Sequence, residues 1–316
     1  MGSVTFEDIL AAARRIAPYA HRTPVLTSSG IDGIVGAQLF FKCENFQRVG
    51  AFKFRGASNA VFSLADEIAA RGVLTHSSGN HAAALALSSR LRGIPATVVM
   101  PSSSPAVKRA AVEGYGARIV ICEPTLASRE ATAERVRLET GGELIHPYDN
   151  DAVIAGQGTA ALELMEEVPD LDLVLAPVGG GGLASGTGVA VAGASPATRV
   201  IGVEPAGADD AFRSLQAGRI IPQTDPHTIA DGLRTSLAPR TFDLIRRHLT
   251  GIVTVEEEEI IAAMRLIWER MKIVIEPSSA VPFAALLARK VDLPYRRAGV
   301  ILSGGNVDLD HLPWAK

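Results

Sequence analysis

Cysteine is scarce in this sequence. Only Cys43 and Cys122 occur among 316 residues, and neither forms a CxxC pair or has a histidine at metal-ligand spacing. The two cysteines therefore indicate neither a disulfide framework nor a zinc site, and a reducing, cytoplasmic location is expected. Long apolar runs are also missing, since no stretch approaches the ~18 uninterrupted apolar residues of a membrane span. The start, MGSVTFEDIL, has two acids and no basic segment, so no targeting segment is expected.

An excess of one charge is lacking as well. The 31 lysines and arginines stand against 34 aspartates and glutamates, a net charge of −3. This balance provides no general attraction to phosphate backbones or anionic lipid, so nucleic acid and membrane are not expected partners. Apolar residues make up 47% and charged residues 21%, which argues against disorder, collagen and coiled coil.

Short β-rich runs alternate with longer segments of helical period, a pattern typical of an α/β protein with largely parallel sheets. The expected strands are Gln38–Cys43, Ala96–Met100, Arg118–Cys122, Asp172–Val178, Val200–Glu204 and Gly299–Ser303. The expected helices are Ala57–Arg71, Asn80–Arg92, Pro105–Tyr115, Ser128–Thr140, Ile154–Glu167, Leu183–Val191 and Glu256–Met271. Thr254 with Glu257 is expected to form a capping box for the last of these helices.

Four consecutive glycines, Gly179–Gly182, join an expected strand to an expected helix. Such a loop points backbone N–H groups at one spot and predicts an anion site suited to phosphate. The pattern Gly179-x-Gly181-x-x-Ala184 also fits the dinucleotide fingerprint, with Glu204 about 20 residues further on to meet a ribose. A dinucleotide site, another phosphate site and a plain tight turn remain equal interpretations of these residues alone.

Lys53 lies between Phe52 and Phe54 and close to Arg55. Apolar walls and a second cation lower the pKa of a lysine, which an amine that attacks a carbonyl requires. The alternative is a lysine that extends from a helix start into solvent.

Two polar loops complete the candidate motifs. Ser77-Ser78-Gly79-Asn80-His81 opens a helix, and its hydroxyls, amide and N–H groups can bind a carboxylate. Ser303-Gly304-Gly305-Asn306 follows a strand, where open α/β sheets bind ligands. An ordinary helix cap and an ordinary turn are the alternatives.

Together these motifs resemble the fold type II pyridoxal-phosphate enzymes of the serine/threonine dehydratase and serine racemase family, which includes threo-3-hydroxyaspartate dehydratases. VIAGQGT (153–159), TIADG (228–232) and ERMKIVIEP (269–277) also look like family sequence, so the resemblance covers nearly the whole chain. It implies two open, twisted, largely parallel sheets flanked by helices. A large domain (1–69 and 149–316) and a small mobile domain (70–148) would enclose pyridoxal 5'-phosphate in the cleft between them.

The resemblance also implies roles for individual residues. Lys53 forms the Schiff base and takes the Cα proton, Phe52 packs on the cofactor ring, and Ser303 faces the pyridine nitrogen. The cofactor phosphate binds to Gly179, Gly180, Gly181 and Gly182. Asn80 bonds the ring hydroxyl, and the substrate is held by Ser77, Ser78, Gly79, Asn80 and His81.

The implied reaction is elimination from a β-hydroxy amino acid, such as L-serine, L-threonine or threo-3-hydroxyaspartate, to a keto acid and ammonia. A neutral Ser303 leaves the pyridine nitrogen largely unprotonated, which favours loss of the β-hydroxyl over a long-lived carbanion. Ser78 matches the second base of racemases, so a racemase using Lys53 and Ser78 is the near alternative. An NAD-dependent oxidoreductase and a cofactor-free amino-acid-binding protein are distant alternatives.

Further expectations concern metal, specificity and assembly. In the racemase branch, Glu204, the Ala208 carbonyl and Asp210 match ligands of Mg²⁺ or Ca²⁺, whereas spacing alone favours solvated acids. Arg129 matches a residue that meets the far carboxylate of a diacid; an exposed helix arginine is the alternative. Ala51 replaces a frequent family serine, which also keeps threo-3-hydroxyaspartate a candidate. The resemblance implies a homodimer, and no C-terminal regulatory domain is expected.

Overall fold

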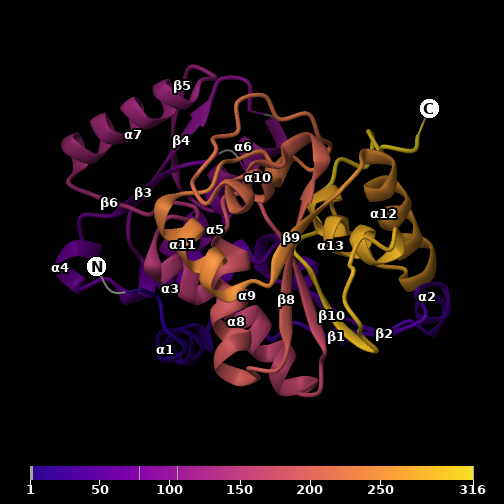
Figure 1. The fold of residues 1–316 in the computed structure, drawn as a ribbon. Helices are drawn as coiled ribbons and strands as arrows, with labels where there is room; N and C mark the ends of the chain where they lie inside the picture. The colour runs from indigo at the N-terminus through magenta and orange to yellow at the C-terminus, as the bar shows by residue number, and fades with distance from the viewer. Residues whose placement is uncertain (1–2, 78, 105, 316) are drawn as a thin grey trace.

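The computed structural model describes residues 3–77, 79–104 and 106–315 of the chain (Figure 1). The strands are β1 (Val25–Leu26), β2 (Gln38–Cys43), β3 (Val73–His76), β4 (Ala96–Pro101), β5 (Arg118–Cys122), β6 (Glu143–Leu144), β7 (Leu173–Pro177), β8 (Arg199–Pro205), β9 (Gly251–Val255) and β10 (Arg297–Leu302). The α-helices are α1 (Phe6–Ile16), α2 (Ser29–Val35), α3 (Lys53–Ser63), α4 (Asp66–Ala69), α5 (Asn80–Arg92), α6 (Ala106–Gly114), α7 (Leu126–Thr140), α8 (Asp151–Glu167), α9 (Gly182–Ala194), α10 (Asp210–Ala217), α11 (Pro239–His248), α12 (Glu257–Met271) and α13 (Pro277–Leu287).

The strands form two sheets. The larger has the order β1-β2-β10-β7-β8-β9, and the smaller has the order β5-β4-β3-β6. Every neighbouring pair is parallel except β1 with β2. The expected α/β class with largely parallel sheets is confirmed.

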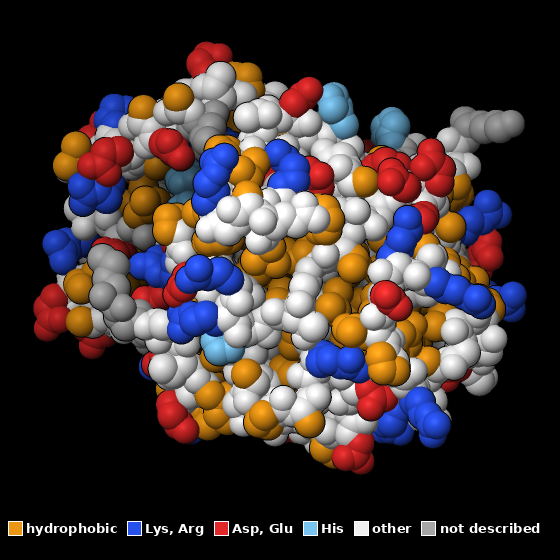
Figure 2. All heavy atoms as spheres, viewed as in Figure 1, with side chains coloured by type: hydrophobic (Ala, Val, Ile, Leu, Met, Phe, Trp, Pro, Cys, Tyr) orange, Lys and Arg blue, Asp and Glu red, His pale blue; other side chains and the backbone are white. Residues whose placement is uncertain are grey.

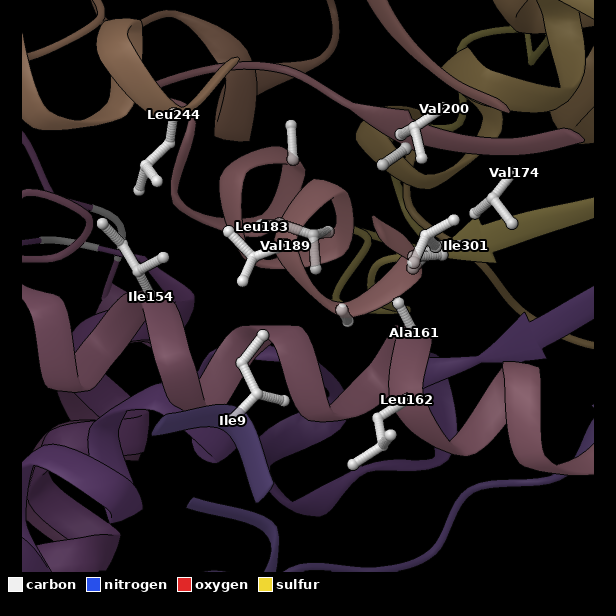
Figure 3. Close-up of a cluster of buried hydrophobic side chains, with 14 of the residues drawn as sticks. Ile9, Ile154, Ala161, Leu162, Val174, Leu183, Val189, Val200, Leu244 and Ile301 are labelled. Atoms are coloured by element: carbon white, nitrogen blue, oxygen red, sulfur yellow. The ribbon is translucent and has the colours of Figure 1, made fainter. Parts of the chain in front are cut away.

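Helices cover both faces of the larger sheet, which explains why its central strands are continuously apolar. All five residues of β7 are buried. On one face, α1, α8, α9 and α11 enclose the core that includes Ile9, Ile154, Leu183 and Ile301 (Figure 3). On the other face, α2, α12 and α13 pack over a second apolar core that includes Phe41 and Phe283. This rigid double layer fixes the ends of its strands.

The smaller sheet is likewise covered on both faces. One apolar cluster joins α5 and α6 to β4, and another joins α7 to β3 and β4. Because all four strands are parallel, their carboxyl ends share one edge of the sheet. The loop that begins at Ser77 leaves this edge, just as the glycine loop leaves β7 and Ser303 follows β10. The three polar motifs thus all follow carboxyl ends of strands, where open sheets bind ligands.

Several expected boundaries are wrong. The helix expected over Ala57–Arg71 is two helices, because Leu64 has an extended backbone and ends α3. That helix begins at Lys53 itself. The expected Thr254 capping box does not form, since Thr254 lies within β9; Glu256 precedes α12 and its N–H donates to the Glu259 carboxylate at 2.8 Å.

The surface agrees with the balanced composition. Acidic and basic side chains are interspersed over the face shown in Figure 2, without a broad region of one charge. Among the described helices, none is both long enough and apolar enough to cross a bilayer.

Candidate active site

The polar motifs meet at one cavity of about 240 Å³. Its walls come from both sheets and from residues far apart in the sequence. The sequence-predicted residues that line it are Phe52, Lys53, Ser77, Gly79, Asn80, His81, Arg129, Gly179, Gly180, Gly181, Gly182 and Ser303. Ser78, the predicted second base, lies outside the described residues. Glu204, Ala208 and Asp210 do not line this cavity.

Lys53 is the amine of the cavity. Its Nζ donates a hydrogen bond to the Pro147 carbonyl at 2.9 Å and lies 5.1 Å from the centre of the Phe52 ring. Burial lowers the pKa of Lys53 to about 8, against a smaller opposing effect of the Glu276 carboxylate. A far larger fraction of this amine is therefore uncharged at neutral pH than for an exposed lysine.

Arg55 does not act on Lys53 in the way expected from the sequence. The guanidinium is fully buried and paired with the carboxylates of Glu44 and Glu163, at 2.7 Å each. Burial is the main cause of the lowered pKa of Lys53, and Arg55 is not among the groups that shift it. Of the two causes expected from the sequence, burial among apolar walls is confirmed and the second cation is wrong.

The glycine loop presents bare backbone to the cavity. A Cβ on Gly180 would lie 2.4 Å from the Tyr148 ring, and one on Gly179 would lie 2.9 Å from the Leu233 Cα. Gly181 has a φ of +85°, which side chains rarely adopt. Within the described chain, the N–H groups of Gly179–Gly181 find no acceptor, and α9 starts here without a side-chain cap. The loop is therefore an anion site at a helix N-terminus.

Asn80 is held from two sides. Its Nδ2 donates to both oxygens of Glu276 at 3.2 Å, and its Oδ1 accepts from Nδ2 of Asn306 at 2.9 Å. Burial raises the pKa of Glu276 to about 7, with a further contribution from Asp231. Sequence reasoning missed Glu276, although it lies in the recognised segment 269–277.

The segment His146-Pro147-Tyr148 was also missed. His146 accepts the N–H of Asp149 at 2.9 Å through Nδ1, and burial lowers the pKa of His146 to about 3, so its ring stays neutral. Its ring meets Tyr148 edge to face at 4.6 Å. This segment therefore supplies the acceptor for Lys53 and the aromatic wall beside the glycine loop.

Ser77 and His81 have partners of their own beside the cavity. Ser77 accepts the N–H of Gly79 at 3.3 Å, and the buried His81 lies 3.2 Å from the Ile145 carbonyl through Nε2. Burial holds the pKa of His81 well below its usual value, so the ring is neutral.

Cationic side chains line the mouth of the cavity. Arg129, in the first turn of α7, makes no ion pair with the part of the chain that is described. Lys108 of α6 pairs with Asp231 at 2.9 Å. A guanidinium at this position can bind a carboxylate that enters the cavity.

A second acidic site lies outside the cavity. Glu204 accepts the N–H groups of Ala211 and Phe212, at 3.2 and 2.7 Å, and Oδ1 of the buried Asp210 has no partner in the described residues. Burial raises the pKa of Glu204 well above its usual value and that of Asp210 to about 6. No group of three or more His, Cys, Asp or Glu side chains converges for a metal in these residues.

This geometry contradicts the dinucleotide alternative. Glu204 is completely buried against the start of α10 and cannot meet a ribose in the cavity. The cavity fits pyridoxal phosphate instead, since it combines free loop N–H groups for a phosphate with a buried amine of lowered pKa.

Known proteins support the same cofactor. The family model described as pyridoxal-phosphate dependent enzyme matches residues 16–304. The chain is 54% identical over 310 residues to beta-hydroxyaspartate dehydratase of Paracoccus denitrificans (strain Pd 1222), covering 98% of each chain. It is 48% identical over 306 residues to L-threo-3-hydroxyaspartate ammonia-lyase of Saccharomyces cerevisiae (strain ATCC 204508 / S288c), covering 96% of this chain and 94% of the relative.

A solved structure matches the fold. The crystal structure of serine racemase from Dictyostelium discoideum has a TM-score of 0.94 and 49% identity, and the match covers 98% of this chain and 100% of that one. The cavity, its lysine and its glycine loop are thus found in a chain that belongs to the family of pyridoxal-phosphate-dependent enzymes.

Proposed function

We propose that this enzyme eliminates water from a β-hydroxy amino acid and releases a keto acid and ammonia. The observation that carries the proposal is a single cavity that holds both the buried Lys53 amine and the anion-binding glycine loop. The dehydratase and ammonia-lyase names of two relatives support the same reaction class.

Pyridoxal phosphate, when bound, supplies an electron sink for the negative charge that develops at the substrate Cα. Lys53 binds the cofactor covalently and, once its amine is free, takes the Cα proton. Burial keeps this amine largely uncharged near neutral pH, and the Pro147 carbonyl orients it. The chain needs no second carboxylate for this proton transfer.

Other groups of the cavity hold the reactants. The N–H groups of Gly179, Gly180, Gly181 and Gly182 would hold the cofactor phosphate, and Phe52 would lie against the ring. Asn80 and Ser303 would supply an amide and a neutral hydroxyl to the ring's polar atoms. The loop Ser77–His81 at the start of α5 binds the α-carboxylate, with Ser78 as part of that loop.

The substrate class that fits best is a β-hydroxy diacid. Arg129 lines the cavity without an ion-pair partner in the described chain, and a planar guanidinium suits a carboxylate. Two relatives have names that state action on hydroxyaspartate. We therefore propose threo-3-hydroxyaspartate as the preferred substrate, whereas the sequence alone placed L-serine and L-threonine first.

Racemisation is the second candidate function. The serine racemase of Dictyostelium discoideum is 49% identical over 316 residues, and this chain has a serine at position 78, where a second base would act from the face opposite Lys53. Elimination and racemisation share the removal of the Cα proton. They differ in the next step, which is loss of the β-hydroxyl in one case and return of a proton from the opposite face in the other.

Some finer features belong to the same proposal. Residues 70–148 act as a small domain that closes over the substrate, consistent with the four strands of the smaller sheet all lying within them. Glu204, the Ala208 carbonyl and Asp210 bind Mg²⁺ or Ca²⁺, supported by the unpartnered Oδ1 of Asp210.

The chain works as a cytoplasmic homodimer, in line with its two buried free thiols and with the family resemblance.

The test compares kcat/KM for L-serine, L-threonine and L-threo-3-hydroxyaspartate, with keto acid and ammonia as measured products. Lys53→Ala should fold, lose borohydride-stable cofactor labelling and lose turnover. Arg129→Ala should cost about 2–5 kcal/mol for the diacid only, the range for a broken charge pair. Steady turnover by Lys53→Ala would overturn the mechanism. An equal loss of kcat/KM for all three substrates in Arg129→Ala would mean that Arg129 does not bind the second carboxylate of the diacid.

A further inference from the structure

His76 lies in the active-site cavity and has no role in the reaction so far. It is the last residue of β3, at the carboxyl edge of the smaller sheet, directly before the loop that begins at Ser77. Its half-buried side chain lines the same cavity as Arg129. Among the described groups its ring has only its own backbone as a hydrogen-bond partner, so one ring nitrogen is free for a ligand.

The aromatic and histidine side chains around His76 are neutral. Its ring meets the His146 ring edge to face at 5.3 Å. His146 accepts the N–H of Asp149 through Nδ1, and burial lowers its pKa to about 3, so that ring carries its proton on Nε2 and no charge. His81 of α5 is neutral because burial holds its pKa well below the usual value. Tyr148, which contacts His146, keeps its proton since burial raises its pKa.

The charges that act on His76 come from α7. Burial is the main cause of the lowered pKa of His76, the positive charge of Arg129 lowers it further, and the Glu130 carboxylate opposes both. Arg129 lines the cavity, whereas Glu130 is exposed to solvent. Two neighbouring positive charges repel each other, so the free enzyme favours a neutral His76 beside a charged Arg129.

A carboxylate bound to Arg129 reverses this preference. Its negative charge cancels the effect of the guanidinium, and the pKa of His76 therefore rises. One proton from solution then moves to the free ring nitrogen, which becomes an N–H donor. A carboxylate has about four acceptor positions and a guanidinium fork occupies two of them, so the new N–H has an acceptor available.

We propose that His76 is a specificity-determining residue that binds the side-chain carboxylate of a diacid substrate jointly with Arg129. It does so in its protonated form and takes up one proton as the diacid binds. L-Serine and L-threonine have no second carboxylate and leave the ring neutral. Discrimination in favour of the diacid therefore becomes stronger as the pH falls. The inference rests on the proposed diacid specificity of Arg129.

The experiment uses the holoenzyme with L-aspartate and L-alanine, which differ in the second carboxylate. Neither has a β-hydroxyl to lose, so binding is measured through the cofactor absorbance without elimination. Titration of Lys53, Glu276 and the ligand amino group should affect both ligands equally, and the ratio of the two dissociation constants removes it. We expect the preference for L-aspartate to be about three- to tenfold larger at pH 6 than at pH 8.5, because protonated His76 adds a charged hydrogen bond.

His76→Gln keeps a polar side chain that cannot become charged. This variant should still prefer L-aspartate through Arg129, but by the same factor at both pH values. Calorimetry in two buffers of different ionisation enthalpy gives the number of protons taken up. In the unmodified protein at neutral pH, L-aspartate should take up more protons than L-alanine, and in His76→Gln this difference should vanish.

His248→Gln is the matched control. His248 ends α11 and is also half-buried, and its pKa is likewise lowered by burial and by an arginine, against an opposing acid. It does not line the cavity, so this variant should keep the pH dependence of the unmodified protein. A preference for L-aspartate that does not change with pH in the unmodified protein, or the full pH dependence in His76→Gln, would overturn the role of His76.

Failure of the proposed diacid specificity looks different. L-Aspartate would then bind no better than L-alanine at either pH, and Arg129→Ala would weaken both ligands equally. A preference for L-aspartate that depends on Arg129 but not on pH or on His76 contradicts only the inference about His76. Since the pH comparison uses the unmodified holoenzyme, it decides even if a variant does not fold.

Discussion

Single glycines decide whether the cavity can hold a phosphate. Gly180→Ala places a methyl group where the Tyr148 ring now lies, 2.4 Å from its nearest carbon. The ring or the loop must move, so we expect at least a tenfold weaker affinity for pyridoxal phosphate, measured by absorbance titration. Gly33→Ala in α2 is the control, because a Cβ there meets nothing within 4 Å. It should keep cofactor affinity and stabilise the protein by up to ~1 kcal/mol.

The buried acids Glu204 and Asp210 give a pH-dependent test of the metal site. Their pKa values are raised in the folded state, so the stability they favour is complete below pH ~4 and is lost as the pH rises through about 6 for Asp210. A divalent cation binds the charged form and should reverse this loss. Mg²⁺ or Ca²⁺ should therefore raise Tm by roughly 3 °C at pH 7.5 and by less at pH 5.

The control for the metal test is the double variant Glu204→Gln/Asp210→Asn, which should not respond to the cation. Equal stabilisation at both pH values would mean that the cation binds elsewhere.

Helix α7 is the element that brings Arg129 to the cavity. It begins after Thr125, whose Oγ1 accepts the N–H of Ser128 at 3.1 Å. Thr125→Ala removes this cap and should cost about 1 kcal/mol of stability. Because Arg129 lies in the same turn, KM for threo-3-hydroxyaspartate should rise more than KM for L-serine.

A matched cap separates the two effects. Thr5 caps α1 in the same way, accepting the N–H of Asp8, and lies outside the cavity. Thr5→Ala should lower the free energy of unfolding without changing either KM. Thr125→Ser keeps a hydroxyl cap and should behave as the unmodified protein does; a KM effect that persists in this variant would show that the cap does not position Arg129.

At the scale of the whole molecule, one ion pair connects the two sheet units across the cavity mouth. Lys108 of α6 meets Asp231 of the 3₁₀ segment Asp231–Leu233, and both side chains are partly exposed. Such pairs contribute less than about 1 kcal/mol, which is enough to bias the proposed closure of residues 70–148 by severalfold. Lys108→Ala and Asp231→Asn should each raise KM about two- to fivefold.

The double variant should be no worse than either single variant, because both changes break the same pair. Arg265→Ala, which removes a pair within α12, is the control and should leave KM unchanged. Additive effects of Lys108→Ala and Asp231→Asn would mean that each residue meets the substrate separately.

The strongly apolar central strands could be predicted from the sequence. Strands covered by helices on both faces are apolar throughout and show no alternation of apolar and polar residues. Gln38–Cys43 occurs as predicted. Arg118–Cys122 also occurs as predicted, although it is the edge strand of the smaller sheet and only one of its residues is buried. The four-residue β3 and the partly buried β9 were missed, since neither pattern is distinctive. Helix α13 was missed as well: Pro282 lies in its interior, and the helix is buried in the second core.

The sequence by itself determined the chemistry of this protein. A lysine between two aromatics, a glycine run after a strand and two polar loops are each local patterns, and together, in this order, they resemble the fold type II pyridoxal-phosphate family, although the glycine run alone left three interpretations open. Local patterns carry this information because a loop that binds phosphate needs only its own backbone N–H groups.

Only the tertiary structure decided how these parts work together. Glu276 reaches Asn80 across 196 residues, and Glu163 reaches Arg55 across 108, so no local pattern shows either contact. The position of Arg55 in the chain predicts that its charge acts on Lys53. In the folded protein Arg55 is instead paired with the carboxylates of Glu44 and Glu163. Charges act through space and not along the chain, and the pKa of the reactive amine is therefore set by burial and by partners that the fold brings close.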